Sequence, residues 1–207
     1  MTRTQLEHLI RAAGAITQEN PLVVVGSQSI LGRYPHIPAS LGESTEADIC
    51  PLNAPEKADL ISGSIGELST FHDSYGYYAH GLPPESCPLP SGWKSRLVTL
   101  KNKNTNGYTG LCLDPADLAT SKLAAGREKD IAFVSAMLAE NIVNPEELLS
   151  LIRALPNEQH RESAIRSLLI CTRPRISIPR EDPATPARPN QPKSFPTRSD
   201  PEIEMGM

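Results

Sequence analysis

The chain has 207 residues, of which 39% are hydrophobic and 21% are charged, and its formal net charge at pH 7 is −4. This length fits one domain with an appendage, and the composition is that of a globular protein rather than a collagen-like or fully disordered one. The net-acidic chain argues against a protein that coats DNA by bulk charge.

The prolines and charges divide the chain into two parts. Eight of the 20 prolines lie in residues 173–207, which carry six Lys or Arg and five Asp or Glu. Residues 1–172 keep 14 basic and 19 acidic side chains. A segment so poor in apolar runs cannot bury enough surface to order itself. We therefore expect one domain at 1–172 and a disordered, proline-rich tail at 173–207.

The chain shows no targeting or membrane signal. Its N-terminal residues are polar, and its apolar runs are too short to span a bilayer. Neither the four cysteines nor the five histidines show the spacing of metal ligands. We expect a cytoplasmic protein with reduced thiols and no membrane partner.

The first predicted elements are a helix and a buried strand. Apolar residues recur at i, i+3 and i+4 in residues 4–18, which predicts an amphipathic helix. The β-branched run Leu22–Val25 predicts a buried strand. Gly26 and Ser27 follow it, and a glycine at a strand end lets the backbone approach a phosphate closely. Gly-Ser after a strand is also an ordinary turn, so both interpretations stay open.

A second strand, predicted at 45–52, carries paired acids. Glu46 and Asp48 are two residues apart, so their carboxylates share one strand face. Two like charges held together are costly without a cation between them, and carboxylate oxygens suit Mg²⁺. The alternative is a solvated acidic strand face.

The middle of the chain predicts further strands. The patterns favour a helix at 55–62 and strands at 75–82, 96–101 and 108–113, the last two joined by a hairpin turn. In the first of these strands Tyr75 and Tyr77 would share a face, placed either to stack a base or to pack in the core.

The C-terminal half reads as helical. Asp114 and Pro115 form a helix start, and the helix is expected to run to about Ala139. Two more helices are predicted at 146–155 and 158–171. The fold class expected from this order is α+β, with a small mixed sheet and a helical C-terminal half.

The first of these helices contains charged residues on a side that also carries apolar residues. On one continuous helix, Lys122 and Asp130 fall near one another, between two apolar sides. Buried charges need partners. Lys122 would find one in a metal-bound triphosphate, in the Glu46 and Asp48 pair, or in an internal salt bridge with Asp130.

Together these segments resemble a known family. The strings Val-Val-Gly-Ser-Gln-Ser-Ile-Leu, Glu-Ala-Asp and Ser-Lys-Leu-Ala-Ala-Gly-Arg-Glu-Lys-Asp look like the minimal nucleotidyltransferase superfamily. More narrowly, they resemble the small bacterial nucleotidyltransferase-like proteins related to the AbiEii and MenA toxins. The resemblance covers residues 22–138.

The resemblance implies a sheet of nucleotidyltransferase type and a role for each matching residue. The nucleoside triphosphate would be bound by Gly26, Ser27, Lys122 and Arg127. Mg²⁺ or Mn²⁺ would be held by Glu46 and Asp48, and the catalytic residues would be Asp48, Lys122 and Asp130.

The reaction implied is attack of an acceptor hydroxyl on the α-phosphate, with release of pyrophosphate. The acceptor would be an RNA such as tRNA, or a protein, within a toxin–antitoxin or defence system that includes a cognate antitoxin. The alternative is a catalytically inactive nucleotidyltransferase-like binding module or antitoxin, which the lack of an obvious third carboxylate favours. An unrelated α+β fold remains open if the site residues do not converge.

Overall fold

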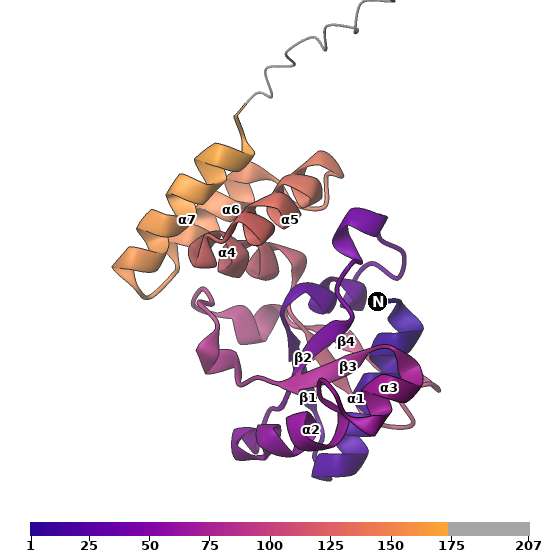
Figure 1. Cartoon of the computed structure of the whole chain (residues 1–207). Coiled ribbons are helices and arrows are strands. Elements are labelled where there is room, and N and C mark those ends of the chain that lie inside the picture. Colours follow the sequence, from indigo (N-terminus) through magenta and orange to yellow (C-terminus); the bar gives the residue numbers. More distant parts are fainter. Residues whose placement is uncertain (174–207) are drawn as a thin grey trace, which may run out of the picture. The chain divides into compact units, whose positions relative to one another are not determined.

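The computed structural model describes residues 1–173, which form one compact unit (Figure 1). The tail expected at 173–207 lies, apart from Arg173, outside the described residues. No helix within residues 1–173 has the length and apolar character needed to cross a bilayer.

The described chain mixes helices and strands as far as residue 112 and is helical from residue 115 onward. Its strands are β1 (Leu22–Val25), β2 (Glu46–Pro51), β3 (Tyr78–Gly81), β4 (Val98–Leu100) and β5 (Gly110–Cys112). Its α-helices are α1 (Arg3–Thr17), α2 (Ala58–Ile65), α3 (Thr70–Tyr75), α4 (Pro115–Ala125), α5 (Glu128–Ala139), α6 (Pro145–Arg153) and α7 (Glu158–Cys171). Short 3₁₀ turns include η1 (Ser27–Gly32), η2 (Ala39–Leu41) and η5 (Trp93–Arg96).

The strands form one mixed sheet in the order β3-β2-β1-β5-β4. β1 is antiparallel to β2 and parallel to β5, β2 is parallel to β3, and β4 is antiparallel to β5. The sheet and its helices confirm the expected α+β class. β1 lies at the centre, and its residues are fully buried, as its run of apolar side chains predicts.

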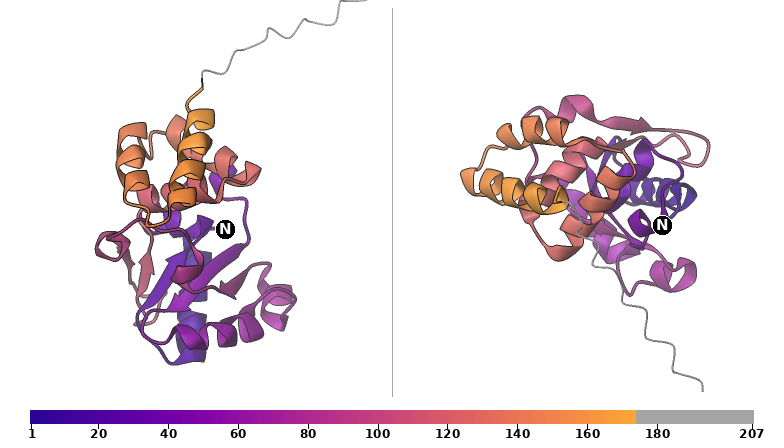
Figure 2. Two further views of the ribbon diagram at one scale, coloured as in Figure 1. Left: turned by 90° about the vertical axis from the view of Figure 1, so that its left-hand side faces the viewer. Right: turned by 90° about the horizontal axis from the view of Figure 1, so that it is seen from above.

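Helices surround the sheet unevenly. α1 and α2 contact each other and the strands β2 and β3. The helices α4 to α7 gather at one end of the sheet (Figures 1 and 2), where α4 contacts η1 and α5 contacts η2. The turns that follow β1 and precede β2 therefore meet the helical half, which brings the two halves of the sequence together at that end.

The prediction of a single helix from Pro115 to about Ala139 is wrong, because two helices, α4 and α5, occupy this segment. Asp114 caps α4 through its side chain, as predicted, but the helix ends at Gly126, whose φ is 66°. A Cβ at Gly126 would lie 2.9 Å from the Ser163 Oγ of α7. Glycine alone tolerates both the left-handed backbone and this close approach, so the chain turns there and α5 begins afresh at Glu128.

The strands predicted at 75–82, 96–101 and 108–113 all begin later than expected, at Tyr78, Val98 and Gly110. Tyr75 ends helix α3, Gly76 caps it with φ 73°, and β3 starts only at Tyr78. Tyr75 and Tyr77 therefore do not share a strand face. They pack instead around His8, whose Nδ1 lies 2.8 Å from the Tyr77 hydroxyl. This aromatic cluster, built from α1 and α3, outweighs the local strand preference.

Arg96, expected in the next strand, lies in η5 because a tertiary ion pair holds it there. Its guanidinium donates two hydrogen bonds, of 2.7 and 2.8 Å, to the fully buried carboxylate of Asp117. Strand β4 begins only at Val98.

Candidate functional site

A cleft of about 730 Å³ lies where the sheet meets the helical half. The end of β1, the η2 loop and strands β2 and β3 line one wall, and α4 and α5 line the other. The residues to which the nucleotidyltransferase resemblance gives a role all line this cleft: Gly26, Ser27, Glu46, Asp48, Lys122, Arg127 and Asp130. An unrelated α+β fold, which remained open only if these residues did not converge, is therefore excluded.

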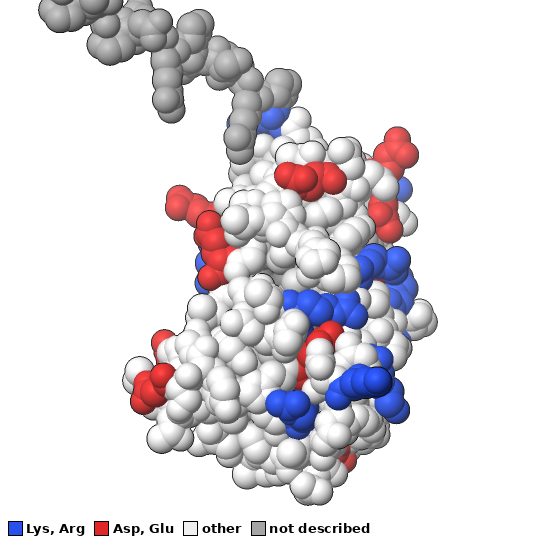
Figure 3. Space-filling view, turned by 90° about the vertical axis from the view of Figure 1, so that its right-hand side faces the viewer, with Lys and Arg blue, Asp and Glu red and all other residues white. Residues whose placement is uncertain are grey.

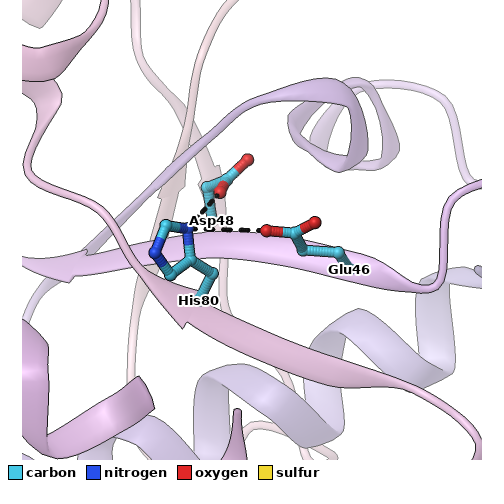
Figure 4. A group of neighbouring side chains, drawn as sticks. All are labelled: Glu46, Asp48 and His80. Atoms are coloured by element: carbon cyan, nitrogen blue, oxygen red, sulfur yellow. Dashed lines mark hydrogen bonds and ion pairs between the residues drawn. The ribbon is translucent and has the colours of Figure 1, made fainter. Parts of the chain in front are cut away.

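The first wall carries three convergent side chains, which we call the acidic wall: Glu46, Asp48 and His80. Strand alternation places Glu46 and Asp48 on one face of β2, and the parallel register sets Asp48 beside His80 of β3. His80 Nδ1 lies 3.3 Å from an Asp48 oxygen and 3.5 Å from a Glu46 oxygen (Figure 4). One potential ligand atom from each of the three residues lies within 4.8 Å of the other two.

The acidic wall is electrostatically strained. Partial burial of Asp48, together with the neighbouring Glu46 carboxylate, raises the pKa of Asp48 above its usual range, against the opposing effects of His80 and Lys122. The second Glu46 oxygen accepts a hydrogen bond of 3.3 Å from the Tyr78 hydroxyl. Two carboxylates and an imidazole that face one point are a donor set that fits a divalent cation.

Gly26 is required where β1 ends against this wall. Its φ of 68° and ψ of −172° lie in a region that only glycine adopts readily. A Cβ built on it would lie 2.0 Å from the Asp48 Oδ2. The β1–β2 register, which pairs Val25 with Asp48, makes this close approach. Ser27 then begins η1 on the rim of the cleft.

The second wall, which we call the basic wall, consists of Lys122, Arg127 and Asp130. Asp130 is fully buried, and its two oxygens accept hydrogen bonds of 2.9 Å from Lys122 Nζ and 2.6 Å from Arg127 Nε. Burial alone would raise the pKa of Asp130, but these hydrogen bonds more than offset it and hold the pKa below its usual range. The Lys122 ammonium also lies 4.6 Å from the centre of the Phe133 ring.

This geometry answers the question that the sequence left open for Lys122. The internal Lys122–Asp130 salt bridge is present, and the turn at Gly126 makes it possible, because eight residues of one continuous helix would separate the two by about 12 Å along its axis. An ammonium has three donors, so one bond to Asp130 leaves Lys122 able to face the cleft that it lines. Asp130 itself is positioned to anchor the two cations.

His80 was missed by the sequence analysis, although it completes the acidic wall. A lone histidine on a short strand carries no metal-ligand spacing, because its partners lie more than 30 residues earlier in the chain. Only the parallel pairing of β2 with β3 sets these residues side by side. The alternation of Tyr78 and His80 on one face of β3 was the available signal.

The molecular surface shows how the two signs of charge are distributed. On the face drawn in Figure 3, Lys and Arg side chains gather around a group of Asp and Glu side chains. Among the residues that line the cleft, Lys129 adds a third basic side chain beside Lys122 and Arg127. An anionic ligand that also carries a cation would meet complementary charge on both walls.

Comparison with known protein families shows which family the chain belongs to. A protein-family model described as a nucleotidyltransferase of unknown function (DUF6036) matches residues 4–169. The match spans both walls of the cleft and every predicted site residue. No curated protein and no solved structure matched the chain.

Proposed function

Because the chain belongs to this DUF6036 nucleotidyltransferase family, we propose that it transfers a nucleotide from a nucleoside triphosphate to an acceptor hydroxyl in the cleft. The observation that carries the proposal is the meeting of paired carboxylates on β2 with Lys122 and Arg127 across one cavity. Nucleotidyl transfer needs this combination, because the triphosphate is anionic and binds together with a cation.

Different residues of the cleft would bind the triphosphate and the cation. The backbone at Gly26 and Ser27, with the side chains of Lys122 and Arg127, would hold the triphosphate. Glu46 and Asp48 would hold Mg²⁺ or Mn²⁺. When bound, such a cation supplies charge stabilisation to the attacking and leaving oxygens.

The reaction proposed exchanges one bond at phosphorus for another. The acceptor hydroxyl releases its proton to solvent as its oxygen bonds to the α-phosphorus, the bond from that phosphorus to the bridging oxygen breaks, and pyrophosphate leaves. Asp130 acts indirectly: it anchors Lys122 and Arg127, so that two cations stand in place before the nucleotide binds.

We further propose that the acceptor is an RNA such as tRNA, or a protein, and that the protein acts in the cytoplasm as the toxin of a toxin–antitoxin or defence system. The support is the resemblance of the Gly-Ser, Glu-Ala-Asp and Ser-Lys-Leu segments to the proteins related to AbiEii and MenA. Growth arrest on expression, relieved by Asp48→Asn and by co-expression of a cognate antitoxin, is the expected outcome.

Transfer is tested directly with α-labelled nucleoside triphosphates, Mg²⁺ or Mn²⁺, and total RNA or protein from cells. Asp48→Asn keeps the shape of the side chain and removes its charge, so it should slow labelling by about a hundredfold or more. Lys122→Met should do likewise. Asp59→Asn, the same change at an exposed position on α2, is the control and should leave labelling unchanged.

One observation favours a second candidate, a catalytically inactive binding module. Among the described residues, a third carboxylate does not join Glu46 and Asp48 at the candidate cation site. Two further carboxylates line the cleft, but Glu43 is exposed, and both oxygens of Asp130 accept hydrogen bonds from Lys122 and Arg127. If wild type transfers no label from any nucleoside triphosphate, and Asp48→Asn changes neither growth nor partner affinity, the binding module is correct and the enzyme is not.

A further inference from the structure

The acidic wall contains a nitrogen donor that a purely carboxylate magnesium site would lack. We infer that His80 is a third ligand, through Nδ1, of the cation that Glu46 and Asp48 hold, and that this site prefers a transition cation such as Mn²⁺ to Mg²⁺. The inference rests on the cation site of the proposed function and adds to it the identity of the ion.

The distances support direct coordination by all three side chains. Adjacent ligands of an octahedral ion with bonds of about 2.1 Å lie about 3 Å apart. His80 Nδ1 lies 3.3 Å from the Asp48 oxygen and 3.5 Å from the Glu46 oxygen, so closing around one ion needs shifts of only tenths of an ångström on those two edges. Figure 4 shows the three side chains pointing toward one another from two neighbouring strands.

The scaffold favours a ligand set that exists before the ion binds. Asp48 and His80 are paired in the β2–β3 register, which fixes the separation of their backbones. The Tyr78 hydroxyl donates to the outer oxygen of Glu46, which leaves the other oxygen turned toward His80. A hydrogen bond of this kind orients a metal-binding carboxylate.

The chemistry of the donors decides which ion is preferred. Mg²⁺ is a hard ion that takes oxygen ligands and keeps much of its water, whereas imidazole nitrogen suits transition metals. Replacing one oxygen ligand by His80 therefore weakens the case for Mg²⁺ and strengthens it for Mn²⁺. Two carboxylates keep the site hard enough for Mn²⁺, which also accepts oxygen ligands.

The test uses the full-length, nucleotide-free protein and the metal ions alone. Mn²⁺ binding is followed by EPR, Mg²⁺ by its competition with Mn²⁺, and coordination by the nitrogen modulation that a bound imidazole gives in pulsed EPR. The variants are His80→Gln, which retains a polar side chain without the imidazole, and His160→Gln, the same change at an exposed position on α7. His80 is itself exposed on an edge strand, so both variants should fold, and their thermal unfolding midpoints check this.

We expect wild type to bind Mn²⁺ at least about tenfold more tightly than Mg²⁺, with nitrogen modulation from one histidine. His80→Gln should lose the modulation and most of the preference, while its affinity for Mg²⁺ stays within about threefold. His160→Gln should match wild type.

Bound Mn²⁺ that gives no nitrogen modulation, or an unchanged preference in His80→Gln, overturns the inference. In that case, loss of Mn²⁺ binding in Asp48→Asn would still leave the cation site of the proposed function standing. If wild type binds neither ion and Asp48→Asn behaves as wild type does, the cation site fails and takes this inference with it.

Discussion

The two walls of the cleft differ in how their carboxylates are paired with opposite charge. On the basic wall each oxygen of the buried Asp130 has a cation, and the pKa of Asp130 is lowered. On the acidic wall Glu46 and Asp48 face each other from one strand face, and the pKa of Asp48 is raised. The buried carboxylate of the basic wall is therefore neutralised within the fold, whereas the acidic wall keeps an excess of negative charge.

This difference separates a structural role from a binding role. On the basic wall, Asp130 neutralises charge on Lys122 and Arg127 and links α4 to α5 before any ligand binds. Like charges gathered at a strand face oppose folding, and an added cation relieves that cost. Stability should therefore depend most on the buried Asp130 of the basic wall, whereas binding of a cation should depend on the acidic wall.

The largest effect on stability is expected from breaking the basic wall. Asp130→Asn keeps the shape of the side chain but leaves Lys122, whose side chain is only 12% exposed, without its counter-charge. Removing one partner of a buried pair costs about 3 kcal/mol of unfolding free energy, which urea denaturation would measure.

Two variants test the origin of that loss. The double variant Lys122→Met/Asp130→Asn should lose less than the sum of the two single variants, because the residues are coupled. Asp59→Asn on the exposed face of α2 should cost less than about 0.5 kcal/mol. An Asp130→Asn protein as stable as wild type would show that the basic wall does not hold the helices together.

An intermediate effect is expected at the junction of β1 and the acidic wall. Gly26→Ala places a Cβ 2.0 Å from the Asp48 Oδ2 in a backbone region that alanine avoids. We expect a loss of about 1–3 kcal/mol in unfolding free energy. Gly63→Ala is the matched control: the new Cβ meets no atom within 4 Å in helix α2, so it should be neutral or stabilising by up to about 1 kcal/mol.

The smallest effect, and the sharpest contrast, is expected in the pH dependence of stability. The pKa of Asp48 is raised in the folded protein, so the protonated side chain favours folding. This contribution to the free energy of unfolding is fully present below pH about 4, where an unperturbed Asp titrates, and it is lost as pH rises through the raised pKa. Asp48→Asn escapes this loss and should therefore gain stability relative to wild type as pH rises.

Asp130 should give the opposite slope. Its lowered pKa makes its contribution present above pH about 4 and lost as pH falls through the lowered pKa, so the deficit of Asp130→Asn should shrink in acid. Urea unfolding of both variants and of wild type at pH 3 to 7 measures the two slopes. Parallel slopes would contradict the distinction between the walls.

Local patterns predicted much of the fold and the composition of the cleft. The buried strand Leu22–Val25, the shared face of Glu46 and Asp48 and the cap at Asp114 all depend on a few neighbouring residues. The α+β class and the nucleotidyltransferase family follow from the order of these elements and from the segments around them. The roles of the site residues remain predictions.

Positions governed by distant contacts were beyond the same reasoning. A glycine inside a helical pattern is often tolerated, but Gly126 adopts φ 66° and ends α4 where it packs against Ser163 of α7. Tyr75 lies in a helix because its ring packs with His8 and Phe71. In both cases the contacting residue of another helix, Ser163 or His8, is far away in the sequence.

The sequence by itself determined which charges this protein possesses and which strand or helix carries most of them, because side-chain periodicity is a local property of the backbone. Only the tertiary structure decided which charges meet. The parallel pairing of β2 with β3 brought His80 to Glu46 and Asp48, and the turn at Gly126 brought Asp130 back to Lys122. These encounters depend on strand register and helix packing, which are set by the burial of the whole core rather than by neighbours in sequence.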